Sequence, residues 1–138
     1  MDRLQIGYIC EPLKWAGWTN ARIALDPARS VGGLDWPAIE RALQADTMQL
    51  VVIRKEGDPV NLLACAVIRS ALTREGEALE IVAAAGSNFR EWAAWGMSAL
   101  RGAARNAGMI RLQLAGRQGW RRIFPDMAMD GDMLTVNV

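Results

Sequence analysis

The chain contains no histidine among its 138 residues. Histidine is the most common general base, a frequent metal ligand and a member of the usual catalytic triads. The absence of histidine excludes a histidine base, a histidine metal ligand and a histidine-containing triad from the chain. Any chemistry would have to use carboxylates, the single tyrosine Tyr8, a thiol or a bound cofactor.

Cysteine, proline and long apolar runs are also scarce. Cys10 and Cys65 are too few and too far apart to form a disulfide framework or a metal site, and Cys65 lies in an apolar run that predicts a small buried side chain. No segment resembles a signal peptide or a membrane span. Five prolines in a chain that is 51% hydrophobic indicate a globular protein. We therefore expect a soluble protein made in the cytoplasm, with no membrane contact.

The near-neutral net charge of +1 excludes a protein that binds polyanions with its whole surface. The charge is unevenly spread, because the segment 90–122 holds seven arginines and one acid, Glu91. Two interpretations stay open: a solvated helix face with interface arginines, or a contact with nucleic acid or an acidic protein.

Residues 1–34 are predicted to be irregular, with a possible first strand over 4–10. Trp15 and Trp18 fall in a predicted loop, either as core residues or as part of a docking surface. Asp35, Trp36 and Pro37 then have the composition of a helix start.

Three strands are predicted next, over 48–55, 60–70 and 79–84, joined by Gly- and Pro-containing turns into an antiparallel meander. Apolar residues at three- and four-residue steps predict a long helix from Gly86 to about Ala107, followed by a strand over 109–114. A strand–helix–strand unit of this length joins parallel strands. A short helix over 119–124 and a strand over 133–138 complete the chain.

This element order over residues 35–138 resembles the GNAT fold of acetyl-CoA-dependent N-acetyltransferases. The resemblance implies an α+β domain with a mixed sheet: an antiparallel meander, a β-α-β crossover and a C-terminal strand. In that family a Gln/Arg-x-x-Gly-x-Gly/Ala loop and a helix N-terminus hold the cofactor pyrophosphate. The equivalent stretch here is Ala83 to Arg90, which retains one glycine and has no Arg or Gln three residues before it.

The resemblance implies a small set of candidate site residues. The candidates for cofactor contact are Ala84, Gly86, Ser87, Asn88 and Phe89, of which Ser87 and Asn88 also suit ordinary helix N-caps. Some GNAT enzymes place a glutamate on the preceding strand as general base, and Glu80 stands there. Strand alternation sends the Glu80 side chain opposite to both neighbours, so either a buried base or an exposed surface residue is possible.

A second resemblance rests on Ala85-Gly86 with Trp92, on Ala104-x-x-x-Gly108 and on Gly116-Arg117-Gln118-Gly119-Trp120. This pattern is similar to a family of small tailed-bacteriophage proteins with a GNAT-like fold. It implies a role in the virion at the head, neck or tail, in several copies, with portal, adaptor or tail proteins as partners and possible proximity to nucleic acid. The candidate contact residues are Arg101, Arg105, Arg117, Trp120, Arg121 and Arg122.

The sequence thus predicts a non-enzymatic virion protein without a cofactor and without a metal. The alternative is an acetyl-CoA-dependent N-acetyltransferase that modifies a host or phage protein. A third possibility is an inhibitor of a host defence or transcription protein.

Overall fold

The computed structural model describes residues 3–29, 35–58, 62–115, 124–130 and 133–138. Within these residues the helices are η1 (Pro12–Lys14), α1 (Trp18–Arg29), α2 (Trp36–Gln44) and α3 (Phe89–Asn106). The strands are β1 (Leu4–Tyr8), β2 (Gln49–Lys55), β3 (Leu62–Leu72), β4 (Glu77–Gly86), β5 (Arg111–Ala115), β6 (Ala128–Asp130) and β7 (Met133–Asn137).

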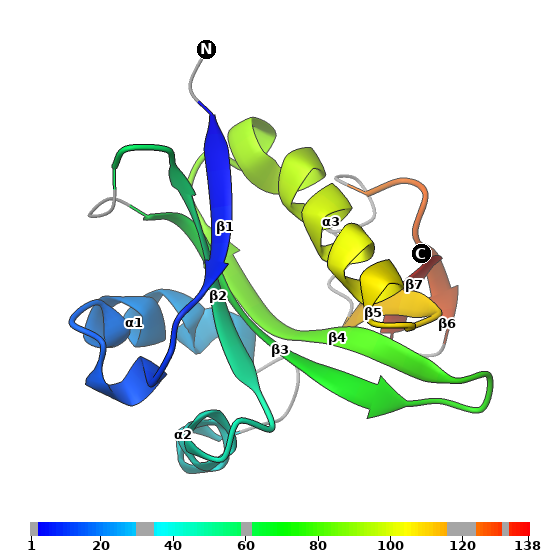
Figure 1. The fold of residues 1–138 in the computed structure, drawn as a ribbon, viewed down its shortest axis with the longest axis horizontal. Helices are drawn as coiled ribbons and strands as arrows, with labels where there is room; N and C mark the ends of the chain where they lie inside the picture. Colours follow the sequence, from blue (N-terminus) through cyan, green and yellow to red (C-terminus); the bar gives the residue numbers. More distant parts are fainter. Residues whose placement is uncertain (1–2, 30–34, 59–61, 116–123, 131–132) are drawn as a thin grey trace.

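The strands form one sheet in the order β1-β2-β3-β4-β5-β7-β6 (Figure 1). β4 and β5 pair in parallel, and the other described neighbours pair antiparallel. Helix α3 makes the crossover between the two parallel strands. The predicted fold class is therefore confirmed: an antiparallel meander, a β-α-β crossover and a C-terminal strand.

The sheet has an apolar core on each face. Strand β2 shows why, since Val51 and Ile53 pack under α3, while Leu50 and Val52 pack against α1 and α2. This alternation is the two-residue period of a strand that is buried on both faces. Figure 1 shows α3 on one side of the sheet and the two N-terminal helices on the other.

Helix α2 forms where its start signal predicts. The Asp35 side chain accepts a hydrogen bond from the Ala38 backbone N–H at 2.8 Å, and Ile39 and Leu43 point into the core. Helix α3 ends at Asn106, and Gly108, just beyond its C-cap Ala107, takes a φ of +78°, a conformation that favours glycine.

The N-terminal prediction is wrong in one respect. Residues 1–34 were predicted to be irregular, but Trp18–Arg29 form helix α1, and β1 joins the sheet edge as predicted. Trp18, Ala21 and Leu25 are buried against the sheet, so Trp18 is a core residue of a helix rather than of a loop. Pro27 lies inside the last turns of α1.

The C-terminal region holds a further difference. Strand β6 was not predicted, and it forms the sheet edge beside β7. The predicted short helix and the Gly-Arg-x-Gly-Trp element fall on residues 116–123, outside the described residues. Among the helices that the structure describes, none is both long enough and apolar enough to cross a bilayer.

Candidate functional site

A β-bulge interrupts β4 in its middle. Val67 on β3 faces Ala83, whereas the next residue, Ile68, faces Ile81, so Val82 is an extra residue. Val82 and Ala83 consequently both pack on the α1/α2 face. The bulge bends the strand and strengthens its local twist.

The bulge lies where β4 parts from β5. The two strands pair only from Ala78 to Ile81 on β4 and from Arg111 to Leu114 on β5. Beyond Ile81, β4 continues to Gly86 with no described strand on its β5 side. We call this opening the fork. Backbone groups that face it are free of sheet pairing within the described chain, and they suit hydrogen bonds to a ligand.

The open end of the fork leads into the N-terminus of α3. The predicted side-chain cap is absent: Asn88 takes a left-handed conformation with a φ of +56° and its side chain makes no cap hydrogen bond. The first backbone N–H groups of a helix have no intrahelical partner, and the helix dipole favours an anion beside them. Arg90, in the first turn, is exposed. A cation at this end opposes the helix dipole, so its placement suits a shared anionic ligand.

The remaining loop glycine serves internal packing. A Cβ built on Gly86 would lie 2.5 Å from the Leu63 carbonyl oxygen and 2.8 Å from Cζ2 of Trp92. The Trp92 indole N–H donates a hydrogen bond to the Ser87 carbonyl at 2.7 Å. Gly86 is therefore required by the contact of β4 with β3 and α3.

Glu80 lies at the closed end of the fork, opposite to its neighbours as predicted: Leu79 and Ile81 pack under α3, while Glu80 faces the other side of the sheet. Its side chain is only 12% exposed. The Arg69 Nε–H donates to Glu80 Oε2 at 2.6 Å, and the Gln113 side-chain amide donates to Oε1 at 2.9 Å.

These partners come from the strands on either side of Glu80, and Thr135 on β7 continues the row beside Gln113. Gln113 is buried. Sequence reasoning missed Arg69 and Gln113, although both interrupt apolar strands and thereby give a signal. Whether Glu80 acts as a base stays a prediction.

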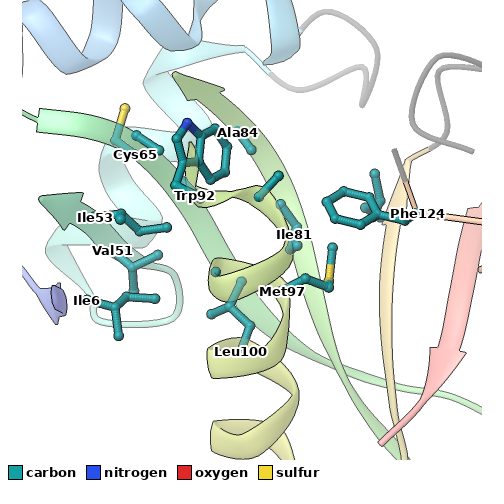
Figure 2. Close-up of a pocket in the computed structure, with 15 residues that line it drawn as sticks. Ile6, Val51, Ile53, Cys65, Ile81, Ala84, Trp92, Met97, Leu100 and Phe124 are labelled. Carbon is teal, nitrogen blue, oxygen red and sulfur yellow. The ribbon is translucent and has the colours of Figure 1, made fainter. Parts of the chain in front are cut away.

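An apolar cavity of about 50 Å³ lies under α3, beside the fork (Figure 2). Its walls come from β4 and β5, which form the fork, from β1 to β3 of the same sheet, from α3 and from Phe124. The residues that border the fork are Ile81, Ala84, Leu114 and Phe124. Phe124 is buried in the core on this face.

Cys65 was predicted correctly as a buried residue; it borders the same cavity, while its side chain packs with the core on the α1/α2 face. Burial raises the pKa of its thiol to about 11. The thiol therefore stays protonated near neutral pH, and a protonated thiol is a poor nucleophile. A covalent acyl intermediate on Cys65 is therefore disfavoured.

The predicted partner-contact arginines divide into three groups. Arg101 binds Asp126 at 3.3 Å and donates to the Asn137 carbonyl at 2.9 Å, so it joins α3 to the C-terminal strands. Arg105 is exposed near the end of α3. Arg117, Arg121 and Arg122 lie, with Trp120, outside the described residues. In the part of the chain that the structure describes, no cluster of three acidic or Cys side chains could hold a metal.

No family model and no curated protein matches this sequence. Solved structures do match. A probable acetyltransferase from Staphylococcus epidermidis aligns with a TM-score of 0.66 over 99% of both chains, at 8% identity. A GNAT family acetyltransferase from Brucella melitensis, solved with acetyl-CoA, aligns with a TM-score of 0.56 over 98% of this chain and 88% of its own, at 15% identity.

A third match is FeeM, an N-acyl amino acid synthase from uncultured soil microbes, with a TM-score of 0.60 over 100% of this chain and 91% of its own, at 11% identity. At these identities the likeness establishes architecture. The chain therefore has the fold of the GNAT acetyltransferases.

Proposed function

We propose that this protein binds an acyl-CoA thioester in the fork and transfers the acyl group to an amine. The observation that carries the proposal is the bulge at Val82, which separates β4 from β5 and turns the open strand toward the N-terminus of α3. One place thus offers backbone groups that have no strand partner among the described residues, a helix N-terminus suited to an anion, and apolar walls. The acetyl-CoA complex of the Brucella melitensis neighbour, which shares the fold, supports this choice.

The chain's residues fit the phosphates of such a ligand in a particular way. Gly86 is filled by contacts with Leu63 and Trp92, so it does not provide the close backbone approach of a glycine-rich loop. We assign the pyrophosphate instead to the first N–H groups of α3 and to the exposed guanidinium of Arg90. Asn88, whose side chain makes no cap hydrogen bond, is positioned to contribute there.

In the transfer step, the amine nitrogen attacks the thioester carbonyl carbon and the carbon–sulfur bond breaks. The amine proton passes to a base, and the CoA sulfur leaves as a thiolate. Glu80 is the carboxylate at the closed end of the fork, on the face opposite to the cavity. Arg69 contacts Glu80 Oε2 through both Nε and Nη2, Gln113 donates to Oε1, and a carboxylate has about four acceptor sites. Glu80 is therefore held in place and retains capacity for a proton.

Calorimetry with acetyl-CoA tests the proposal. We expect micromolar binding that Arg90→Glu weakens at least tenfold, because the substitution places an anion against the phosphates. Arg105→Glu, an exposed position near the other end of α3, is the matched control and keeps the wild-type affinity. Circular dichroism checks that both variants fold. No binding at millimolar acetyl-CoA overturns the proposal.

The virion role is a separate prediction, which rests on the phage-like sequence pattern, and the structural comparisons lend it no support. Portal, adaptor or tail proteins would be the partners. Mass spectrometry of purified particles tests it, and particles that contain no copy of this chain would remove it.

A further inference from the structure

The cavity under α3 has chemistry of one kind. Nearly all of its lining is apolar, and it is contributed by aliphatic and aromatic residues of β1 to β5 and α3 and by Phe124; Trp92 is the lining residue with a ring N–H. That indole N–H is already bonded to the Ser87 carbonyl. An apolar cavity of this kind does not hold ordered water well, and it favours a hydrocarbon guest.

The cavity also adjoins the fork. Ile81 and Leu114 are the last paired residues of β4 and β5, and both belong to its wall. Two further lining residues are Ala84, which follows the paired part of β4, and Phe124; both are labelled in Figure 2. A group that extends from a thioester carbonyl in the fork toward α3 would enter this space.

We propose that the cavity receives the hydrocarbon chain of an acyl group longer than acetyl, so that the preferred donor is a medium-chain acyl-CoA of about four to six carbons. This rests on the proposed function. The volume sets the length: a water-sized group needs roughly 10–15 Å³ by this measure, so about 50 Å³ accepts about three to five methylene-sized groups beyond the carbonyl carbon.

The test is a binding series by calorimetry with CoA, acetyl-, butanoyl-, hexanoyl- and decanoyl-CoA. Each buried methylene contributes about a fourfold gain in affinity. We expect about a fifteenfold gain from acetyl to butanoyl, a further gain to hexanoyl, and none to decanoyl because the cavity is then full.

Two neighbouring alanines of α3 provide a matched pair. Ala93 is 4% exposed and lines the cavity, whereas Ala94 is exposed. Ala93→Leu fills the space and should reduce hexanoyl-CoA affinity to the acetyl-CoA level. Ala94→Leu makes the same chemical change outside the cavity and should leave the series as in the wild type.

Leu100→Ala makes the opposite change and covers the case in which Ala93→Leu does not fold. Leu100 lines the cavity, and its truncation enlarges the space. The optimum should move toward longer chains, with decanoyl-CoA gaining affinity at least tenfold. A loosened fold alone would not produce such a gain.

The outcomes separate the two proposals. If CoA and acetyl-CoA bind but affinity stays flat to hexanoyl-CoA, the cavity assignment is overturned and the proposed function stands. In another outcome, affinity rises with acyl length in the wild type and rises equally in a folded Ala93→Leu variant. The acyl chain then lies elsewhere, and the cavity assignment is again overturned. Leu100→Ala decides the same question where Ala93→Leu does not fold. If neither CoA nor any thioester binds, both proposals are overturned.

Discussion

At the scale of single residues, the buried thiol of Cys65 links stability to pH. Burial raises its pKa from 9.0 to about 11 in the folded chain. Because the pKa is higher in the folded chain, the contribution of the protonated Cys65 thiol to the free energy of unfolding is fully present below pH 9 and is lost as the pH rises toward 11. Between pH 8.5 and 11, the unfolding free energy should fall by about 2–3 kcal/mol more in the wild type than in Cys65→Ala, from two pKa units at about 1.4 kcal/mol each.

Urea denaturation at both pH values measures this difference. Cys10→Ala removes the exposed thiol and serves as the control, with a pH dependence like that of the wild type. Parallel curves for the wild type and Cys65→Ala would contradict the prediction.

The burial of Cys65 was predictable because an apolar run surrounds it, whereas the environment of Glu80 was only half predictable. Alternation correctly places its side chain opposite to Leu79 and Ile81. Its partners Arg69 and Gln113 lie 11 and 33 residues away. Strand register decides that contact, and a one-residue slip in either pairing would separate the groups. No local pattern in the sequence fixes that register.

At the scale of elements, patterns with a strong period were predictable and the bulge was not. The helix from Trp36 carries a cap, a proline and an apolar stripe, and it forms as predicted. Helix α1 has spacing of three and four at Trp18, Ala21 and Leu25, but it also contains Pro27. Pro27 lacks the N–H that would bond to the carbonyl four residues back, so the helix forms despite the loss of that bond, with Trp18, Ala21 and Leu25 buried against the sheet.

The bulge at Val82 leaves no such trace, since Ile81 to Ala85 are uniformly apolar and fit an unbroken buried strand equally well. The fork depends on that single extra residue. The sequence therefore predicts the elements that carry the site, while the opening between them follows from three-dimensional pairing.

Two glycines, one before α3 and one within it, allow the effect of tight packing on stability to be measured separately from the effect of helix propensity. A Cβ at Gly86 would meet the Leu63 backbone oxygen, which cannot move aside, whereas a Cβ at Gly102 meets nothing within 4 Å. Gly86→Ala should therefore destabilise the free protein by about 1–3 kcal/mol, the usual cost of overpacking. Gly102→Ala should stabilise it by about 0.5–1 kcal/mol through helix propensity.

Urea denaturation of both variants without any ligand measures these changes. Equal stability of Gly86→Ala and the wild type would show that Gly86 is not held by internal packing. If Gly86→Ala loses stability without any ligand, Gly86 is required for packing of the free protein, independently of a cofactor.

At the scale of the whole molecule, the sheet separates two environments, and the fork lies between them. On the α3 face lie the cavity and the helix N-terminus, and on the other face Arg69, Glu80 and Gln113 form a polar row. If a thioester carbonyl lay in the fork, its acyl chain would extend toward the α3 face, and an amine would approach the carbonyl from the opposite face. In the proposed reaction, the carboxylate and the apolar cavity would therefore act from opposite faces of the sheet.

Glu80→Gln tests this arrangement. The amide keeps the size of the side chain but is not a base, so acyl transfer should fall by about 10²–10⁴-fold, the range of a general base. Acetyl-CoA affinity should stay within about twofold, because the sites proposed for the phosphates and the acyl chain lie on the other face. Release of CoA thiol with a panel of primary amines measures transfer, and Glu77→Gln, at an exposed position on the same strand, is the matched control. Transfer at the wild-type rate in a folded Glu80→Gln variant would assign Arg69, Glu80 and Gln113 to cohesion of the sheet alone.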